Sequence, residues 1–249
     1  MKRHTIDLNC DLGEGMGNDA VIMPLISSAN IACGAHAGDL ATMRETVALA
    51  KANGVAIGAH PGFADRENFG RKELRLKPRN LEQLVVRQIA ALRELTELSH
   101  VKPHGALYNL AARDRDVAEV FARAIQWIDP DLLLFAPSGS ELARAGREAG
   151  LRVVEEVFAD RTYQGDGTLT PRSQPRSTIE FAPQAIAQAC RMIEHGEVEA
   201  LDGTLVKVTA ETICLHGDHP HAVAFARELR TALAERRIDV RAPAAVQIS

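Results

Sequence analysis

Val55-Ala-Ile-Gly-Ala-His60 is a short apolar run that ends in a histidine close to a glycine, and it indicates the fold class. Short apolar runs of this length are typical of buried strands, and such a glycine marks a turn where backbone approaches closely. Three further stretches share the pattern: Ile31-Ala-Cys-Gly-Ala-His36, Val101-Lys-Pro-His104-Gly105 and Ile213-Cys-Leu-His216-Gly217. If the four strands lie in one parallel sheet, their histidines converge at its carboxyl edge, where α/β folds build active sites.

Outward from these stretches, strand-like and helix-like segments alternate along the whole chain. Strands are predicted at Thr5–Asn9, Ser28–Ala32, Val55–Ala59, His100–Pro103, Leu132–Ala136, Val153–Val157 and Thr212–His216. Helices are predicted at Asp39–Asn53, Leu81–Leu98, Asp116–Ile128, Ser140–Ala149, Pro183–His195 and Pro220–Arg236, with Asn80 as one cap and Ser138-Gly-Ser-Glu141 as a capping box. Strict alternation without a linker favours one α/β domain over residues 1–249, a closed or nearly closed parallel barrel. An open doubly wound sheet is the main alternative.

Composition excludes several classes of partner. The net charge of −4, with basic residues spread along the chain, argues against nucleic acid and anionic membranes. No apolar run approaches 18 residues and no signal-type segment follows Met1, so we expect a cytoplasmic protein without membrane spans. The four cysteines form no CxxC pair and are expected to be reduced, buried thiols.

The first strand carries acidic and polar side chains on one face. Because strand side chains alternate between faces, Asp7, Asn9 and Asp11 share a side that would look into the barrel. Buried carboxylates cost several kcal/mol unless they are paired, so they serve either chemistry or a structural ion pair with a barrel lysine or arginine. Lys102, two residues before His104 on the fourth strand, is the cation best placed for such a pair or for stabilising an oxyanion.

The histidines allow two interpretations. His36, His60 and His104 together with Asp11 are candidate ligands of a divalent metal, because imidazole and carboxylate suit zinc and similar ions. No HExxH or HxH spacing ties two ligands to one element, so the metal stays open, and each histidine alone could be a core residue. Two long connections, Pro61–Lys77 and Phe158–Ser177, bring arginines to the same face of the barrel.

Read in order, these stretches resemble the LamB/YcsF family. The matching blocks are Asp7-Leu-Asn-Cys-Asp-Leu-Gly-Glu14, Ala29-Asn-Ile-Ala-Cys-Gly-Ala-His-Ala-Gly-Asp39, Gly58-Ala-His-Pro-Gly62, Phe69-Gly-Arg71, Val101-Lys-Pro-His-Gly-Ala-Leu-Tyr108, Glu156-Val-Phe-Ala-Asp-Arg-Thr-Tyr163 and Cys214-Leu-His-Gly-Asp218. The resemblance implies a distorted seven-stranded (β/α) TIM-like barrel related to the glycoside hydrolase/deacetylase superfamily. It also implies the reaction of the bacterial ATP-dependent 5-oxoprolinase, of which this chain would be the A subunit. That enzyme cleaves 5-oxo-L-proline (pyroglutamate) to L-glutamate with formation of ADP and phosphate.

The resemblance also implies partners and roles. The partners would be the 5-oxoprolinase subunits B and C, and ATP, with Mg²⁺, the co-substrate. The expected catalytic residues are Asp11, His60, Lys102 and His104, and the expected substrate or nucleotide contacts are Asp7, Asn9, Glu14, Asn30, His36, Arg71, Tyr108, Arg161 and His216. Two alternatives remain: a metal-dependent hydrolase of the deacetylase kind, and a non-catalytic subunit that binds 5-oxoproline for its partners.

Overall fold

Seven parallel strands close into a barrel in the computed structural model, which describes residues 4–215 and 222–244. The strands are β1 (Thr5–Leu12), β2 (Ser28–Ala32), β3 (Ala56–His60), β4 (His100–Val101), β5 (Leu133–Pro137), β6 (Val153–Phe158) and β9 (Thr212–Leu215). Each pairs in parallel with the next, and β9 pairs with both β6 and β1. The predicted α/β barrel is confirmed, and the open sheet was the wrong alternative.

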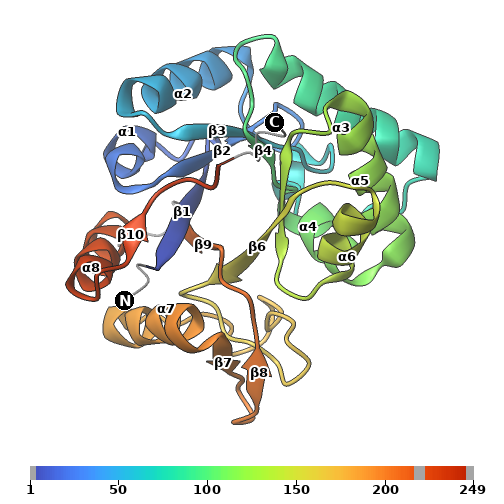
Figure 1. Ribbon diagram of the computed structural model, residues 1–249. Helices are drawn as coiled ribbons and strands as arrows, with labels where there is room; N and C mark the ends of the chain where they lie inside the picture. The colour runs from blue at the N-terminus through green and yellow to red at the C-terminus, as the bar shows by residue number, and fades with distance from the viewer. Residues whose placement is uncertain (1–3, 216–221, 245–249) are drawn as a thin grey trace.

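Helices form the outer layer of the barrel (Figure 1). Those predicted from the sequence are α2 (Leu40–Asn53), α3 (Pro78–Arg93), α5 (Arg115–Ile128), α6 (Glu141–Glu148), α7 (Ala182–His195) and α8 (Ala222–Glu235). Gly54 and Gly196 end α2 and α7 in the left-handed conformation, as their positions in the sequence indicate. Among the described residues, none of the helices combines the length and the apolar character that a membrane span requires.

Several short elements were not predicted. They are α1 (Asp19–Ile22), the 3₁₀ turns η1 (Met23–Leu25) and η2 (Arg66–Asn68), α4 (Gly105–Arg113), the antiparallel pair β7 (Glu197–Glu199) and β8 (Leu205–Lys207), and β10 (Asp239–Val240), which pairs with β1. The most consequential is α4, because it begins directly after His104 and leaves β4 only two residues long. The prediction of a strand to Pro103 was therefore too long.

Two predicted helix caps were wrong. Helix α3 begins at Pro78, since proline suits the first turn, and Asn80 lies inside the helix. Helix α6 is capped by Ser140, whose Oγ accepts a hydrogen bond from the Ala143 N–H. The Oγ of Ser138 instead donates to Glu155 on β6. The predicted helices thus exist, but their first turns are fixed by residues next to those expected.

The strands carry different chemistry on their two faces. Side chains facing the helices are apolar and belong to the main core, for example Leu8, Ile31 and Val101. The face toward the lumen is mostly polar, and two small buried clusters adjoin it: one of Leu133, Phe135 and Val154, and one of Tyr108, Phe158 and Cys214. A polar lumen cannot gain stability from hydrophobic burial alone, so its hydrogen bonds must be satisfied from within.

Candidate metal centre at the barrel mouth

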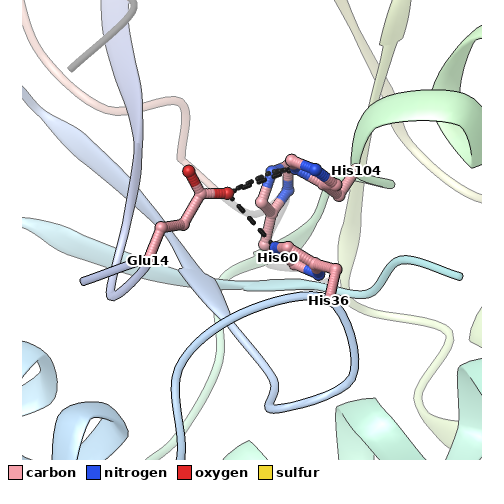
Figure 2. Close-up of side chains that lie close together, drawn as sticks. All are labelled: Glu14, His36, His60 and His104. Carbon is pink, nitrogen blue, oxygen red and sulfur yellow. Dashed lines mark hydrogen bonds and ion pairs between the residues drawn. The ribbon is translucent and has the colours of Figure 1, made fainter. Parts of the chain in front are cut away.

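Four side chains meet where β1, β2, β3 and β4 end (Figure 2). Glu14 follows β1, His36 follows β2, His60 ends β3, and His104 precedes α4. One ligand atom from each of the four lies within 4.8 Å of the others. The predicted convergence of His36, His60 and His104 is thus observed, whereas His216 lies outside the described residues.

One oxygen of Glu14 lies at the centre of this group. Its Oε1 is 3.2 Å from His36 Nε2, 3.2 Å from His104 Nδ1 and 3.9 Å from His60 Nε2. The rings of His36 and His104 stack with their centroids 3.8 Å apart. We call Glu14, His36, His60 and His104 the mouth cluster.

Glycines allow this close packing. A Cβ at Gly62 would lie 2.8 Å from His36 Nδ1, and one at Gly70 would lie 2.7 Å from His36 Cβ. Gly70 also has a φ of +65°, which other residues rarely adopt. The two glycines after β3 are therefore part of the site, since any side chain there would displace an imidazole.

Backbone carbonyls fix the tautomers of two histidines. His60 Nδ1 lies 2.8 Å from the Lys102 carbonyl oxygen, and His104 Nε2 lies 2.9 Å from the Phe69 carbonyl oxygen. A carbonyl only accepts, so both nitrogens carry the proton. The remaining nitrogens, His60 Nε2 and His104 Nδ1, then face each other at 3.0 Å with lone pairs, beside the Glu14 carboxylate. Three acceptors that converge in this way require a cation or a shared proton between them.

The mouth cluster fits a divalent metal ion. Tetrahedral zinc with nitrogen and oxygen ligands holds its donor atoms about 3.3 Å apart. Glu14 Oε1 lies 3.2 to 3.9 Å from the three imidazoles, His60 and His104 are 3.0 Å apart, and all four ligand atoms lie within 4.8 Å of one another. Metal-bound histidines usually donate their other N–H to a carbonyl or carboxylate, as His60 and His104 do. His36 differs, because its Nδ1 has no hydrogen-bond partner in the described part of the chain.

Electrostatics at the mouth also favour a cation. Burial would raise the pKa of Glu14, but the imidazoles of His104 and His36, each 3.2 Å away, bring it to about 2, a shift that requires a shared proton or other positive charge in the mouth cluster. Burial likewise opposes ionisation of Asp11, yet His60 and Lys102 hold its pKa well below the usual range. Burial lowers the pKa of His36 to about 4, so this ring is neutral near pH 7. Burial opposes a charge on His60, but the adjacent Asp11 carboxylate raises its pKa, so the ionised carboxylates favour positive charge at the mouth, either as a proton on His60 or as a bound cation.

Lys102 lies below the mouth cluster, in the lumen. Its Nζ contacts Glu156 Oε1 at 2.8 Å, Asp11 Oδ1 at 3.0 Å, Asn9 Oδ1 at 3.1 Å and Cys214 Sγ at 3.1 Å. An ammonium has three N–H donors, so these partners use all of them. The side chain is 3% exposed. Lys102 therefore orients Asp11 and has no free proton to offer an oxyanion, the role that the sequence suggested as one option.

Amide side chains extend this network through the barrel. Asn30 Nδ2 donates to Asn9 Oδ1 at 2.7 Å and to Asp11 Oδ1 at 2.8 Å, and Asn30 Oδ1 accepts from His100 Nε2. Asp7, at the far end, accepts from Ser27, Ser28 and Thr212 hydroxyls. Asp7, Asn9 and Asn30 are thus buried structural members of the lumen, where we had expected substrate contacts. Asp11 alone reaches the mouth, with Oδ2 3.3 Å from His60 Nε2.

Glu156 belongs to the site but was not predicted from the sequence. It is buried on β6, and its two oxygens accept from Asn9 Nδ2 at 2.8 Å and from Tyr108 Oη at 2.5 Å. Two adjacent carboxylates inside an otherwise apolar strand, Val153-Val-Glu-Glu-Val157, were the available signal. Tyr108, a predicted substrate contact, is buried with its hydroxyl engaged by Glu156.

The two predicted arginines differ in environment. Arg71 is exposed at the rim, with its guanidinium carbon 5.2 Å from the Phe69 ring centroid. Arg161 is 7% exposed and lies in the long connection after β6.

Comparison with known proteins agrees with this fold. The crystal structure of a lactam utilization protein from Thermus thermophilus is 46% identical, with a TM-score of 0.90 over 96% of this chain and 100% of that chain. A family 4 carbohydrate esterase from Streptomyces lividans is 9% identical, with a TM-score of 0.51 over 98% of this chain and 95% of its own. The T48 deacetylase is 13% identical, with a TM-score of 0.50 over 96% of this chain and 87% of its own. The last two likenesses show the fold alone.

The family itself is shown by a match along nearly the whole sequence. The model of the LamB/YcsF family matches residues 6–248, which include every member of the mouth cluster and of the lumen network. The chain therefore belongs to the LamB/YcsF family.

Proposed function

We propose that this chain cleaves the lactam bond of 5-oxo-L-proline to give L-glutamate, with ATP converted to ADP and phosphate, as the A subunit of a 5-oxoprolinase completed by subunits B and C. The observation that carries the proposal is the mouth cluster, three imidazoles and a carboxylate whose acceptor atoms converge beside the ionised Asp11. Membership of the LamB/YcsF family and 46% identity to a lactam utilization protein support a lactam as the substrate.

The chemistry explains why ATP is needed. A lactam amide is a poor electrophile, and phosphoryl transfer from ATP to its oxygen releases ADP and activates the carbonyl carbon. Water then adds to that carbon, and the C–N bond breaks as the nitrogen takes a proton, which gives γ-glutamyl phosphate. A second water releases phosphate and leaves glutamate. The partner subunits would share in binding the nucleotide, for which Arg71 remains the predicted contact at the rim of this chain.

The residues of this chain suit the hydrolytic half of that sequence. Lys102 and Asn30 hold Asp11 Oδ1, which leaves Oδ2 at the mouth as an ionised acceptor for the proton of an attacking water. Glu14, His60 and His104, with His36 beside them, would hold a divalent cation. When bound, such a cation polarises a carbonyl or phosphoryl oxygen and lowers the pKa of water. The polar lumen below keeps Asp11 in one orientation.

The test is glutamate formation from 5-oxoproline by the chain mixed with subunits B and C. We expect turnover only with ATP, one ADP per glutamate, and loss in Asp11→Asn and His104→Ala. Turnover without ATP, or none with all subunits present, contradicts the proposal. If both variants keep full turnover while 5-oxoproline binds more weakly, the chain is instead a binding subunit.

A second candidate is a metal-dependent hydrolase that needs no ATP. The lone pairs of His60 Nε2 and His104 Nδ1, which face each other at 3.0 Å, favour it. Hydrolysis of a lactam or an acetylated substrate by the chain alone, abolished by a chelator and restored by zinc, would establish this candidate and displace the first.

A further inference from the structure

Arg161 lies across the barrel mouth from the mouth cluster. In the closed barrel, β3 and β6 are separated by β4 and β5 on one side and by β9, β1 and β2 on the other. The carboxyl ends of β3 and β6 therefore lie on opposite walls. Arg161 follows β6, in a connection whose two arms pair at Arg161–Thr178 and Tyr163–Leu169. A small ligand at the mouth would thus lie between the imidazoles and this arm.

The guanidinium of Arg161 is buried against neutral acceptors. Its Nε donates to the Ser177 carbonyl at 3.0 Å and its Nη2 to the Thr170 carbonyl at 2.7 Å. Within residues 4–215 and 222–244, these hydrogen bonds go to carbonyl oxygens, and the nearest acidic group acting on Arg161 is the adjacent Asp160. Gln188 on α7 donates to the Arg161 carbonyl, so the backbone is fixed as well. The arginine is thus held in place by hydrogen bonds to uncharged acceptors.

Such a charge is costly unless something compensates it. Removing a cation from water costs several kcal/mol, which neutral carbonyls offset only in part. Burial and the nearby Arg172 lower the pKa of Arg161 by more than the adjacent Asp160 raises it, the shift expected where positive charge is under-compensated. The Thr170 hydroxyl, in the residue that holds Nη2, is fully buried and also lacks a partner in the described part of the chain. A guanidinium and a hydroxyl together offer the donors that a carboxylate accepts.

We propose that Arg161 binds the α-carboxylate of the lactam and so makes the site specific for lactams that carry an acid group. This assignment rests on the proposed function and deepens it. Two other cations near the mouth suit this role less well. Lys102 uses its donors within the lumen, and Arg71 is exposed at the rim. Arginine suits the role because its planar donors match a carboxylate.

The test compares 5-oxoproline with 5-oxoprolinamide, which has the same ring but a neutral carboxamide. With the three subunits and ATP, one measures KM and kcat for 5-oxoproline, and the inhibition constant of the amide. Arg161→Gln should raise the KM by about 30-fold, the effect of losing a charged hydrogen-bonded contact, and change kcat by less than about 3-fold. The inhibition constant of the amide should stay within about 3-fold of the wild-type value.

A merely structural role gives another pattern. If Arg161 only ties the two arms together, the affinities for acid and amide fall in parallel and kcat falls with them, which overturns the inference. Arg176→Gln, at an exposed arginine of the same connection, is the matched control and should leave all three constants unchanged.

Arg161→Lys keeps the inference testable if the glutamine variant does not fold. It retains the charge but loses the planar donors, so KM should rise by about 10-fold while the amide constant stays unchanged. Parallel losses with acid and amide again overturn it. Absence of turnover in the wild-type complex is a different outcome, because that result rejects the proposed function itself.

Discussion

The lumen and the mouth of the barrel are both polar, but only the lumen is satisfied. Lys102, Asn9 and Asn30 use their donors on neighbours within hydrogen-bond distance. At the mouth, at or beyond the carboxyl ends of β1 to β4, His60 Nε2 and His104 Nδ1 meet with lone pairs, and His36 Nδ1 has no partner in the described chain.

This difference separates structure from chemistry. A satisfied buried network stabilises one conformation and has nothing left to offer a ligand. Converging acceptors cost stability unless a shared proton, a cation or a substrate offsets that cost. Substitutions in the lumen should therefore act first on folding, and substitutions at the mouth first on activity.

The largest expected effect is that of Glu14→Gln. The amide keeps the shape of the carboxylate but loses the charge at the centre of the mouth cluster, so we expect glutamate formation to fall by about 10³-fold or more. The free energy of unfolding should fall by less than in Lys102→Met, because the amide keeps the shape and hydrogen-bonding atoms of the carboxylate and loses only its charge. Steady-state kinetics and urea unfolding measure both quantities. A variant that is destabilised yet active would remove the distinction between mouth and lumen.

Lys102→Met, in the lumen, should act first on the stability of the fold. It leaves the carboxylates of Asp11 and Glu156 without their shared cation, and breaking a buried pair in this way costs about 3–5 kcal/mol. The measurement is the midpoint of urea unfolding against that of Lys207→Met, an exposed lysine on β8. A midpoint equal to the control would show that the lumen network does not stabilise the fold.

Asp7 makes the stability of the lumen depend on pH. Burial raises its pKa from 3.8 to about 6, so between these values the folded protein binds the proton more tightly than the unfolded chain. Its contribution to stability is therefore complete below about pH 4 and is lost as pH rises through 6, by up to about 3 kcal/mol. Asp7→Asn should remove that loss, so that the stability of the variant relative to wild type increases from about pH 4 to about pH 7 in urea unfolding. A difference that is constant over this range contradicts the assignment.

The sequence predicted much of this arrangement because strand periodicity, together with the alternation of strands and helices, allows few arrangements of the chain. Alternation along β1 was enough to direct Asp7, Asn9 and Asp11 inward, and equivalent strand ends were enough to bring His36, His60 and His104 together. Which polar residue is already bonded and which is free depends on partners far apart in the chain, such as Asn9 and Glu156. No spacing shows this, so Lys102 was assigned to chemistry, Glu156 was missed, and Glu14 was named only as a substrate contact.

The smallest effect should come from a position outside both regions. Ser140→Ala removes the cap of α6 and should cost about 1 kcal/mol with unchanged activity. Asn80→Ala is its control, because Asn80 lies within α3 and caps nothing. Thermal unfolding of both variants measures the difference, and equal melting temperatures would show that the Ser140 hydroxyl does not stabilise α6.

The most direct test of the mouth cluster is calorimetric titration of zinc into the metal-stripped chain at about pH 7. We predict one ion bound per chain, with Glu14→Gln and His104→Ala each weakening the affinity by at least about 10-fold and Lys207→Met leaving it unchanged. Absence of zinc binding by the folded wild-type chain, or equal affinity in the Glu14→Gln variant, would contradict the assignment of the mouth cluster as a metal centre.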